Sequence, residues 1–411
     1  MVHTDTDAIA KLKELSAGSG LDLSGGMIRR SSSRFCLGVE HGDYNGTELF
    51  GVGTDRYIWL AFKPNESSSI RLFSGNFVNE GVIVFEAGRA PDPGSDIFGK
   101  SWARFPMGVD YILRREGMPL TRGMDMVIFG NIPGGGMSRS ASLTLNLILS
   151  MLEASGIAPP DPLKIVDMAQ AVENDYIGSP CGQLDQVMIL FAREGQGTHY
   201  NPADRSIRYV PLGEQAPDFR LVSLDTGTLR PGLENSTYKI RRAECETLVD
   251  MASREFDISC LAEIRDDSVY SKIFDRFKDS HPDLCKRMRY IYSAQKRFYT
   301  LLDAWENGDI HTVGKVFRED GIGLRDDYRI SGPELETMCD LARAVPGVLG
   351  ERMLGGGDKG AAGAIVLSGS LETLEKTIRQ GYPRSHPGYA DCFAVHALRS
   401  VQGIMRLKGW Q

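Results

Sequence analysis

The 411-residue sequence lacks the features that mark several common classes of protein. Its seven cysteines are scattered, odd in number and without a C-x-x-C pair, which argues against a disulfide framework or a structural zinc site and for a reducing compartment. No run of about 18 uninterrupted apolar residues occurs, so no transmembrane helix is predicted. The N-terminal segment carries acidic residues and no long apolar region, unlike a secretory signal. We therefore expect a cytoplasmic protein.

An excess of positive charge is also missing. The formal net charge is −7, so we expect no broad surface for nucleic acid or for anionic membranes, and a phosphate ligand would need a local positive site. The chain has no internal repeat and no low-complexity tail. Its 42% hydrophobic and 25% charged residues are ordinary for a soluble globular protein, and its length predicts two domains or one large composite domain.

The order of the predicted elements indicates an α+β fold with clustered helices and strands. The polar stretch LGEQAPDF contains a proline, and we take it as the boundary between a domain of residues 1–215 and a domain of residues 216–411. The first domain is predicted to contain, in order, a short helix in the first twenty residues, strands between 34 and 85, a helix at 101–117, a strand at 123–132, two helical stretches up to 175 and a hairpin at 197–213. The second is predicted to contain a strand at 219–227, helices from 241 to about 319, a β-rich glycine segment at 348–370 and a closing strand at 389–398.

Three consecutive glycines follow Pro133 in the stretch NIPGGGMSRSASLTLNLILSML, residues 131–152. The unpaired N–H groups at the start of a helix carry partial positive charge, and glycine lets an anion approach the backbone closely, so this loop is a candidate phosphate site. A capped helix after an ordinary turn is the alternative, because serine is a favoured N-cap residue. The lysine of a Walker loop is absent, so the segment is not a P-loop. The apolar residues after the loop recur with the period of an amphipathic helix: Leu145, Ile148, Leu149 and Leu152.

A second glycine run, GGGDKG at residues 355–360, formally matches G-x-G-x-x-G. The dinucleotide-binding form of that pattern opens a helix, whereas the AAGAIVLSG that follows here is typical of a strand, so we reject a dinucleotide site. We expect the run to bring backbone close to a second part of the same ligand. A tight turn between strands is the alternative.

Two polar segments carry groups suited to a hydroxyl-rich ligand and to a metal ion. GVEHGDYNG, residues 38–46, packs donors and acceptors into one turn, although a solvated Asn-Gly hairpin turn would also explain it. In AVENDYIGSPCGQLDQVMI, residues 171–189, Glu173 and Asp185 flank a Pro-Cys-Gly loop. They could serve Mg²⁺ and a reacting hydroxyl, or each could be a surface carboxylate. Together these pieces are the parts needed to transfer a phosphoryl group from Mg–ATP to a hydroxyl.

The chain resembles the GHMP kinase superfamily, and within it the galactokinase branch, over most of its length. The likeness implies a two-domain α+β GHMP kinase fold with the active site in the cleft between the domains. Five segments carry it in the family's order: RFCLGVEHGDYNG, similar to the galactokinase signature; PGGGMSRSASL, similar to the phosphate-binding loop; ENDYIGSPCGQLDQ, similar to the stretch with the metal glutamate and the catalytic aspartate; STYKIRRAECE, similar to a segment whose tyrosine lies near the sugar; and GGGDKGAAGAIV, similar to the third glycine motif.

The resemblance implies a role for each matching residue. Asp185 would lie against the sugar hydroxyl that is phosphorylated, and Arg34 would keep Asp185 ionised and stabilise developing charge. Ser140 and Glu173 would bind the Mg²⁺ that bridges the ATP phosphates. The sugar hydroxyls would be bound by Glu40, His41, Asp43, Gly182 and Tyr238. The ATP phosphates would lie against Gly134, Gly135, Gly136, Ser138, Arg139, Ser140 and Ser142, and the third-motif loop would contribute Gly355, Gly356, Gly357 and Lys359.

The chain departs from the family pattern at a few positions. Plant-type galacturonokinases carry a basic residue where Lys359 stands and have a segment similar to AVPGV (344–348), but they depart from the Glu-His-x-Asp-Tyr that this chain keeps. The other departures are Ser32-Ser33 for Pro-Gly before the signature arginine, Arg139 for a serine and Asn174 for a histidine.

The resemblance implies an ATP-dependent kinase that phosphorylates the anomeric C1 hydroxyl of galactose or a related sugar. The enzyme would be a monomer or homodimer that binds neither nucleic acid nor membranes. Galacturonokinase or another sugar-1-kinase is an alternative, and a non-catalytic galactokinase-like sugar sensor is an alternative of a different class, made possible by Arg139 in the phosphate loop. A sensor needs the binding residues but not the full chemical set, so the retention of Arg34, Ser140, Glu173 and Asp185 favours the enzyme.

Overall fold

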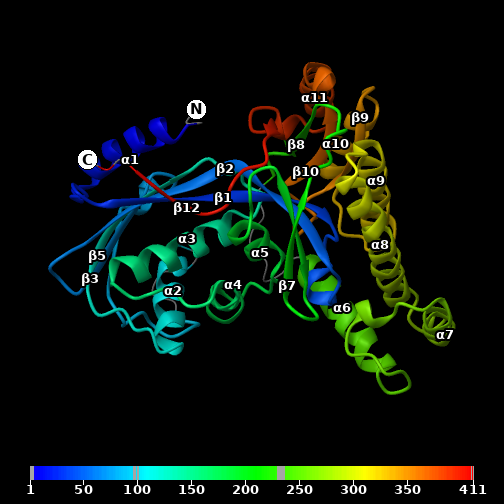
Figure 1. The fold of residues 1–411 in the computed structure, drawn as a ribbon, viewed down its shortest axis with the longest axis horizontal. Coiled ribbons are helices and arrows are strands. Elements are labelled where there is room, and N and C mark those ends of the chain that lie inside the picture. Colours follow the sequence, from blue (N-terminus) through cyan, green and yellow to red (C-terminus); the bar gives the residue numbers. More distant parts are fainter. Residues whose placement is uncertain (1–3, 96–98, 100, 229–236, 409, 411) are drawn as a thin grey trace.

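Figure 1 shows the computed structural model of the chain, which describes residues 4–95, 99, 101–228, 237–408 and 410. The larger of its two sheets has eight strands in the order β12-β1-β2-β5-β3-β4, with the β6–β7 hairpin joined to β2. All neighbouring strands pair antiparallel except β3 and β5, which pair in parallel. The strands are β1 (Met27–Gly38), β2 (Leu49–Pro64), β3 (Ser69–Ser74), β4 (Val82–Glu86), β5 (Met124–Gly130), β6 (Gln196–Asn201), β7 (Ser206–Pro211) and β12 (Met405–Leu407).

Helices cover both faces of this sheet, as the alternation of side chains along β2 requires. Trp59 and Ala61 pack with α1 on one face, whereas Ile58, Leu60 and Phe62 join the main core on the other face. Figure 1 shows α1 above the sheet and α2 to α4 beneath it. These helices are α1 (Asp5–Ser19), α2 (Arg104–Arg115), α3 (Arg139–Ala154), α4 (Pro162–Ala171), which runs into a π-helical turn (Val172–Ile177), and α5 (Leu184–Leu190).

The second sheet has four antiparallel strands in the order β11-β8-β10-β9. Its strands are β8 (Phe219–Asp225), β9 (Val348–Met353), β10 (Ala361–Leu367) and β11 (Ala394–Leu398). Helices α9 and α10 pack against β9, and the long helices α8 and α9 run side by side at one end of the molecule (Figure 1). The helices of this half are α6 (Thr237–Ala252), α7 (Asp267–Phe277), α8 (Pro282–Glu306), α9 (Ile310–Asp326), α10 (Pro333–Arg343) and α11 (Leu371–Ser385).

The α+β class and most of the predicted elements are confirmed. The Leu145, Ile148 and Leu152 side chains of α3 are fully buried, and Asp161 caps α4 by accepting a hydrogen bond from the Leu163 N–H (2.8 Å). The glycine run at 355–360 is followed by strand β10 and not by a helix, as predicted. None of the helices in the described part of the chain is long and apolar enough to cross a membrane.

Four of these helices and strands were not predicted: α5, which has only seven residues, α10, α11 and β12. Helix α11 contains Gly381 and Pro383, which weaken a helical pattern, and β12 is a three-residue strand that pairs only with β1. The chain crosses from the first sheet to the second through residues 212–218, and β12 then brings its C-terminal part back to the first sheet. A domain division at 215/216 stays a prediction.

Candidate active site

A cavity of about 700 Å³ lies where three loops meet: the glycine loop before α3, the Pro-Cys-Gly loop before α5 and the glycine loop between β9 and β10. Residues from both predicted domains line it, so the chain folds motifs that are far apart in sequence around one space. We call one side of the cavity the carboxylate half, which is formed by Arg34, Glu40, His41, Asp43, Glu173, Gly182, Asp185 and Tyr238. We call the other side the glycine-loop half, which is formed by the loop before α3, Ser138, Arg139 and the apolar side chains described below.

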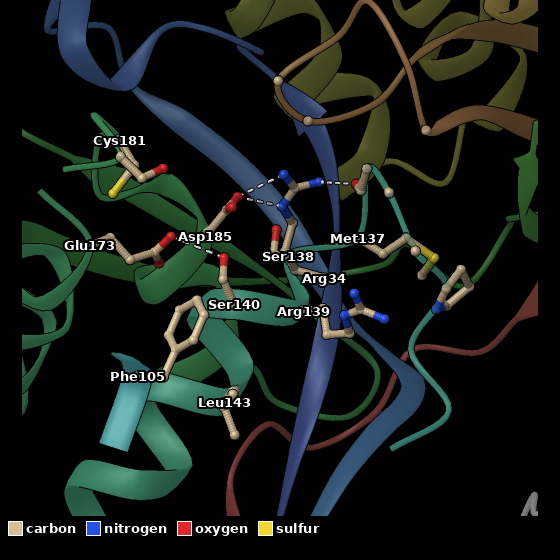
Figure 2. A pocket seen from close by; sticks show the side chains of 18 of the residues that line it. Arg34, Phe105, Met137, Ser138, Arg139, Ser140, Leu143, Glu173, Cys181 and Asp185 are labelled. Atoms are coloured by element: carbon tan, nitrogen blue, oxygen red, sulfur yellow. Dashed lines mark hydrogen bonds and ion pairs between the residues drawn. The ribbon is translucent and has the colours of Figure 1, made fainter. Parts of the chain in front are cut away.

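An ion pair between Arg34 and Asp185 occupies the centre of the cavity (Figure 2). Arg34, on β1, is 1% exposed and places its Nη2 2.6 Å and its Nε 2.7 Å from Asp185 Oδ1, while Asp185, at the start of α5, keeps 31% of its side chain accessible. The Arg34 Nη1 donates to the carbonyl of Gly136 in the glycine loop (3.0 Å). One guanidinium therefore ties the carboxylate half to the glycine-loop half. Burial lowers the pKa of Arg34, but the charges of Asp185 and Glu40 more than offset it and keep the side chain cationic.

The turn after β1 supplies three further residues of the carboxylate half: Glu40, His41 and Asp43. His41 adopts a positive φ of 61°, and its Nδ1 lies 2.9 Å from the Tyr44 hydroxyl. The ring of Tyr238, from α6, lies 5.3 Å from the ring of His41. This side of the cavity thus combines carboxylates with the rings of His41 and Tyr238, and the Tyr44 ring packs against both.

The Pro-Cys-Gly loop meets this turn at Gly182. A Cβ at Gly182 would lie 1.9 Å from Asp43 Oδ2, so only glycine permits the contact. Asp43 also accepts a hydrogen bond from the Leu184 N–H (3.3 Å). Asn174, where the family usually has histidine, holds the same loop, because its amide bonds both the N–H (2.7 Å) and the carbonyl (3.1 Å) of Cys181.

The carboxylates crowd one another. Burial, together with the negative charge of Asp185, raises the pKa of Asp43 to about 6 and that of Glu173 to about 7. Burial also raises the pKa of Glu40, although Arg34 and Arg352 act against it. A ligand that donates hydrogen bonds or brings a cation would relieve this crowding.

Ser140 and Glu173 lie together on the border of the two halves. The Ser140 hydroxyl donates to Glu173 Oε2 (2.9 Å), and Gln186, which sequence reasoning did not single out, donates from Nε2 to Glu173 Oε1 (3.3 Å). Glu173 belongs to the π-helical turn after α4, a geometry that is frequent at functional sites. Among the described residues, no lysine or arginine pairs with this buried carboxylate.

The two glycine loops touch each other backbone to backbone. A Cβ at Gly135 would lie 2.3 Å from the Gly360 Cα, so neither loop has room for a side chain there. Gly355, Gly356 and Gly360 line the same cavity as the first loop. The second glycine run therefore faces the same space as the first.

The first turn of α3 presents unused polar groups to the cavity. Ser138 occupies the N-cap position at φ 59°, but its side chain makes no cap hydrogen bond, and its buried hydroxyl has no partner among the described residues. Arg139, the next residue, is exposed into the cavity and forms no hydrogen bond or ion pair with any described residue. Figure 2 shows its guanidinium pointing away from Ser140 and Glu173. The exclusion of water by nearby chain atoms lowers the pKa of Arg139, and the charge of Asp225 raises it.

Apolar side chains form an extension of the glycine-loop half that sequence reasoning missed. Phe77 and Trp102 stack at a centroid distance of 6.4 Å and an interplanar angle of 16°, and Arg104 beside them donates to the Ile177 carbonyl. Within a sequence, such residues are indistinguishable from ordinary core residues of a helix or strand. We call this the apolar extension; its residues are Ile58, Phe77, Trp102, Phe105, Ile128, Leu143 and Ile177.

Three predicted contacts differ from the structure. The Ser142 side chain does not line the cavity, because it points into the core, where its hydroxyl lies 2.8 Å from that of Ser31. Gly357 packs against the Ile330 carbonyl, which a Cβ would approach to 2.2 Å, and it does not line the cavity. Lys359 does not line the cavity either. Proximity in a motif is not enough to bring a side chain to the site, since neighbouring residues of a helix or loop face different directions.

Comparisons with known proteins agree with this geometry. Residues 106–193 match the family described as GHMP kinases N terminal domain. The chain is 32% identical to galactokinase from Lacticaseibacillus casei strain BL23 over 87% of this chain and 89% of the relative, and 32% identical to galactokinase from Streptococcus mutans serotype c over 92% and 94%. The crystal structure of Lactococcus lactis galactokinase complexed with galactose superposes with a TM-score of 0.88 at 27% identity, and covers 97% of this chain and 100% of that one. Methanococcus jannaschii mevalonate kinase, at 15% identity and a TM-score of 0.62, shares the fold. The chain belongs to the galactokinase family of GHMP kinases, whose members use ATP.

Proposed function

We propose that this protein is a galactokinase, which transfers the γ-phosphoryl group of ATP to the anomeric C1 hydroxyl of galactose or a closely related sugar. In this reaction a bond forms between the sugar oxygen and the γ-phosphorus, the bond from that phosphorus to the β–γ bridging oxygen breaks, and ADP leaves. The hydroxyl proton must be accepted. Positioning and electrostatic stabilisation supply most of the catalysis in phosphoryl transfer.

The carboxylate half is the proposed sugar site. Glu40, His41, Asp43 and Tyr238 offer acceptors and donors for the sugar hydroxyls, and Gly182, where a Cβ would clash with Asp43, lets the Pro-Cys-Gly loop lie against that carboxylate. Asp185 is the partly exposed carboxylate at the centre of the cavity. It would accept a hydrogen bond from the C1 hydroxyl, orient that oxygen toward the phosphorus and receive its proton.

Arg34 is the proposed partner of Asp185 in catalysis. Its two contacts with Asp185 orient the carboxylate, and its bond to the Gly136 carbonyl places it beside the loop where the phosphates would lie. A fixed cation at that point would stabilise the charge that develops during transfer. No rearrangement is needed to bring the two halves together, because Arg34 already touches both.

The glycine-loop half is the proposed ATP site. The free N–H groups at the start of α3, the unpartnered Ser138 hydroxyl and the unpaired Arg139 suit a polyphosphate, and the apolar extension suits a flat nucleobase. The phosphate contacts are assigned to Gly134, Gly135, Gly136, Ser138, Arg139 and Ser140, with Gly355 and Gly356 of the second loop closing the space.

Ser140 and Glu173 would hold Mg²⁺. They are hard oxygen ligands in direct contact, and Glu173 is a buried carboxylate with no basic partner among the described residues, so the pair fits a cation. A magnesium ion bound by one carboxylate, a hydroxyl and substrate phosphates needs no larger cluster of protein ligands. When bound, it would neutralise charge on the β- and γ-phosphates.

The observation that carries the proposal is the Asp185–Arg34–Gly136 connection: one accessible carboxylate fixed between a hydroxyl-binding wall and a phosphate-type loop. A sensor would have no need of it. The test is coupled ADP release by purified protein with Mg–ATP on a panel of galactose, galacturonate, glucose, arabinose, glucuronate and N-acetylgalactosamine.

Turnover of galactose that is lost in Asp185→Asn supports the proposal and its catalytic assignment. Turnover of galacturonate in preference to galactose would replace the sugar and keep the reaction. If no sugar of the panel is turned over although galactose raises the melting temperature, the protein is a sensor and the proposal is wrong. Stabilisation by ATP alone would indicate a sugar outside the panel.

A further inference from the structure

Behind the carboxylate half lies a buried arginine that does not line the cavity. Arg352, on β9 of the second sheet, is fully buried, and its guanidinium lies 4.4 Å from the centroid of the Phe317 ring. Its polar contacts come from Nη2 alone, which donates to the Cys36 carbonyl (2.9 Å) and to Glu40 Oε2 (3.2 Å). Its Nε and Nη1 have no hydrogen-bond partner among the described residues. Burying a cation with so few hydrogen-bond partners is costly, which calls for an explanation beyond packing.

The contact with Glu40 offers that explanation. The Glu40 carboxylate is 3% exposed and is shared between two cations, with Oε1 3.7 Å from Arg34 Nη2 and Oε2 3.2 Å from Arg352 Nη2. Successive ion pairs therefore form a series of alternating charge, in the order Asp185, Arg34, Glu40 and Arg352. The first three residues come from the first sheet and its attached elements, and the last comes from the second sheet.

Removal of the Arg352 charge would affect every residue of this series. Of its two cationic partners, Glu40 would keep only Arg34, which it shares with Asp185. Either Arg34 shifts toward Glu40 and away from Asp185, or Glu40 takes up a proton and turns. In the first case Asp185 loses its contact with Arg34, and in the second Glu40 moves. A carboxylate of the proposed sugar site therefore changes its surroundings or its position in both cases. Asp320, the other carboxylate whose charge acts on Arg352, keeps its own partner, Arg297, at 2.7 Å.

We propose that Arg352 is a positioning residue for the sugar site: from the second sheet it fixes Glu40, and through Glu40 it keeps Arg34 directed at Asp185. This inference rests on the proposed function, since it assigns the sugar to the carboxylate half. It predicts that sugar binding depends on a residue that never touches sugar. ATP binding, in the glycine-loop half, should depend on it little.

The experiment compares Arg352→Met with Arg318→Met. Methionine keeps a long side chain against Phe317 and removes the charge. Arg318, on α9, pairs with the buried Glu351 (2.7 Å), the residue next to Arg352 on the same strand, but successive strand residues face opposite sides. The two substitutions therefore each remove one positive charge from the same region, but only Arg352 belongs to the series of ion pairs that ends at Asp185.

In Arg352→Met we expect the KM for the sugar to rise about tenfold, as for the loss of a charged hydrogen-bond partner, with a fall in kcat and little change in the KM for ATP. In Arg318→Met we expect a lower melting temperature and an unchanged sugar KM. Arg352→Lys, which keeps the charge but not the fork of donors, should recover part of the sugar affinity.

The proposal is overturned if Arg352→Met changes the KM values for sugar and ATP equally, or if it behaves like Arg318→Met. Where Arg352→Met does not fold, Arg352→Lys against Arg318→Lys gives the same comparison. Calorimetric titration with galactose is measured for all variants. If the unaltered protein binds galactose without turnover, the proposed function fails, while a weaker binding in Arg352→Met would still support the role of Arg352.

Discussion

The two halves of the cavity differ in how completely their side chains are partnered. In the carboxylate half, Arg34 contacts Asp185 and Glu40, Glu40 contacts a second arginine, and Asp43 accepts a backbone N–H. In the glycine-loop half, Arg139 has no partner among the described residues, and the Ser138 hydroxyl and the Trp102 Nε1 are buried without one. Apart from Glu173, which pairs with no lysine or arginine among the described residues, the carboxylate half is a closed network, whereas the glycine-loop half is a set of unused donors.

This difference suggests how each half treats its ligand. A network that is already satisfied fixes the positions of its oxygens, and fixed groups can distinguish the hydroxyl pattern of one sugar from another. Hydrogen-bond donors without a protein partner are instead available to an anion with many oxygens, and any polyphosphate is such an anion. The carboxylate half should therefore determine specificity and turnover, and the glycine-loop half should determine the affinity for nucleotide.

The largest effect is expected from Arg34→Met, which opens the closed network at its centre. It leaves Asp185 and Glu40 without their shared cation, and breaking a buried ion pair of this kind costs ~3–5 kcal/mol of unfolding free energy. We also expect kcat to fall by at least about 10²-fold, because a charge that stabilises the transition state is lost. Chemical denaturation and steady-state kinetics measure the two effects.

The matched control is Arg104→Met in the glycine-loop half. Arg104 also lines the cavity, but its protein contact is the carbonyl of Ile177, so we expect a stability loss of only ~1 kcal/mol. Equal losses in the two variants would mean that the two halves are organised alike, and the comparison would be wrong.

Asp43→Asn separates stability from function within the carboxylate half. The pKa of Asp43 is raised from its usual 3.8 to about 6, so its contribution to stability is fully present below pH 3.8 and is lost as the pH rises through 6. Full ionisation at pH 8 then costs the ligand-free protein up to ~3 kcal/mol, which asparagine does not incur. We expect Asp43→Asn to gain stability relative to the unaltered protein between pH 4 and pH 8, while its sugar KM rises.

Denaturation curves at a series of pH values measure this difference. A stability difference that stays constant over that pH range would show that Asp43 is ionised without penalty. The Asp204→Asn variant serves as the control, because Asp204 is a solvent-exposed carboxylate in the β6–β7 turn that does not line the cavity, and its pKa is lowered and not raised.

Most residues of the carboxylate half were predicted, although Arg34, Gly182 and Tyr238 were assigned only through the family resemblance. A cluster such as Glu40, His41 and Asp43 in one turn, or a glutamate and an aspartate around a Pro-Cys-Gly loop, has no role in a core and therefore stands out. The α+β class was predictable for a related reason: short β-prone runs and amphipathic stretches report directly on which face is buried.

The glycine-loop half was only partly predictable. Its loop was identified by its glycines, but Phe77, Trp102 and Phe105 are apolar residues whose sequence setting is the same whether they pack in a core or line a cavity. Ser142 shows the converse error, since it sits two residues after Ser140 yet bonds to Ser31 in the core. Gln186 and Arg352 act through other residues, and such roles follow from contacts between distant segments that no local pattern contains.

Arg139→Ser restores the residue that the family usually has at this position and tests the unused donors directly. If Arg139 contacts the phosphates, we expect the KM for ATP to rise about tenfold, or ~1.4 kcal/mol, and the sugar KM to stay the same. The salt dependence of ATP binding should weaken as well, because one charge contact is lost. The KM of Arg139→Lys for ATP should lie between that of the unaltered protein and that of Arg139→Ser. A lower KM for ATP in Arg139→Ser would show instead that the arginine obstructs the loop.

Trp102→Phe is expected to have the smallest effect and to separate two roles of one side chain. Trp102 is 5% exposed, stacks on Phe77, and buries its Nε1 without a partner among the described residues. An unpartnered buried donor destabilises the ligand-free protein, so its removal offsets the loss of apolar contact, and we expect the unfolding free energy to change by less than ~1 kcal/mol.

If the same N–H serves the nucleobase, the KM for ATP rises about threefold, the size of a weak hydrogen bond. The affinity for ATP then changes while the unfolding free energy does not, as expected at a site whose hydrogen-bond donors serve a ligand. A stability loss of several kcal/mol without a change in KM would assign Trp102 to the core, and the glycine-loop half would lose part of its contrast with the carboxylate half.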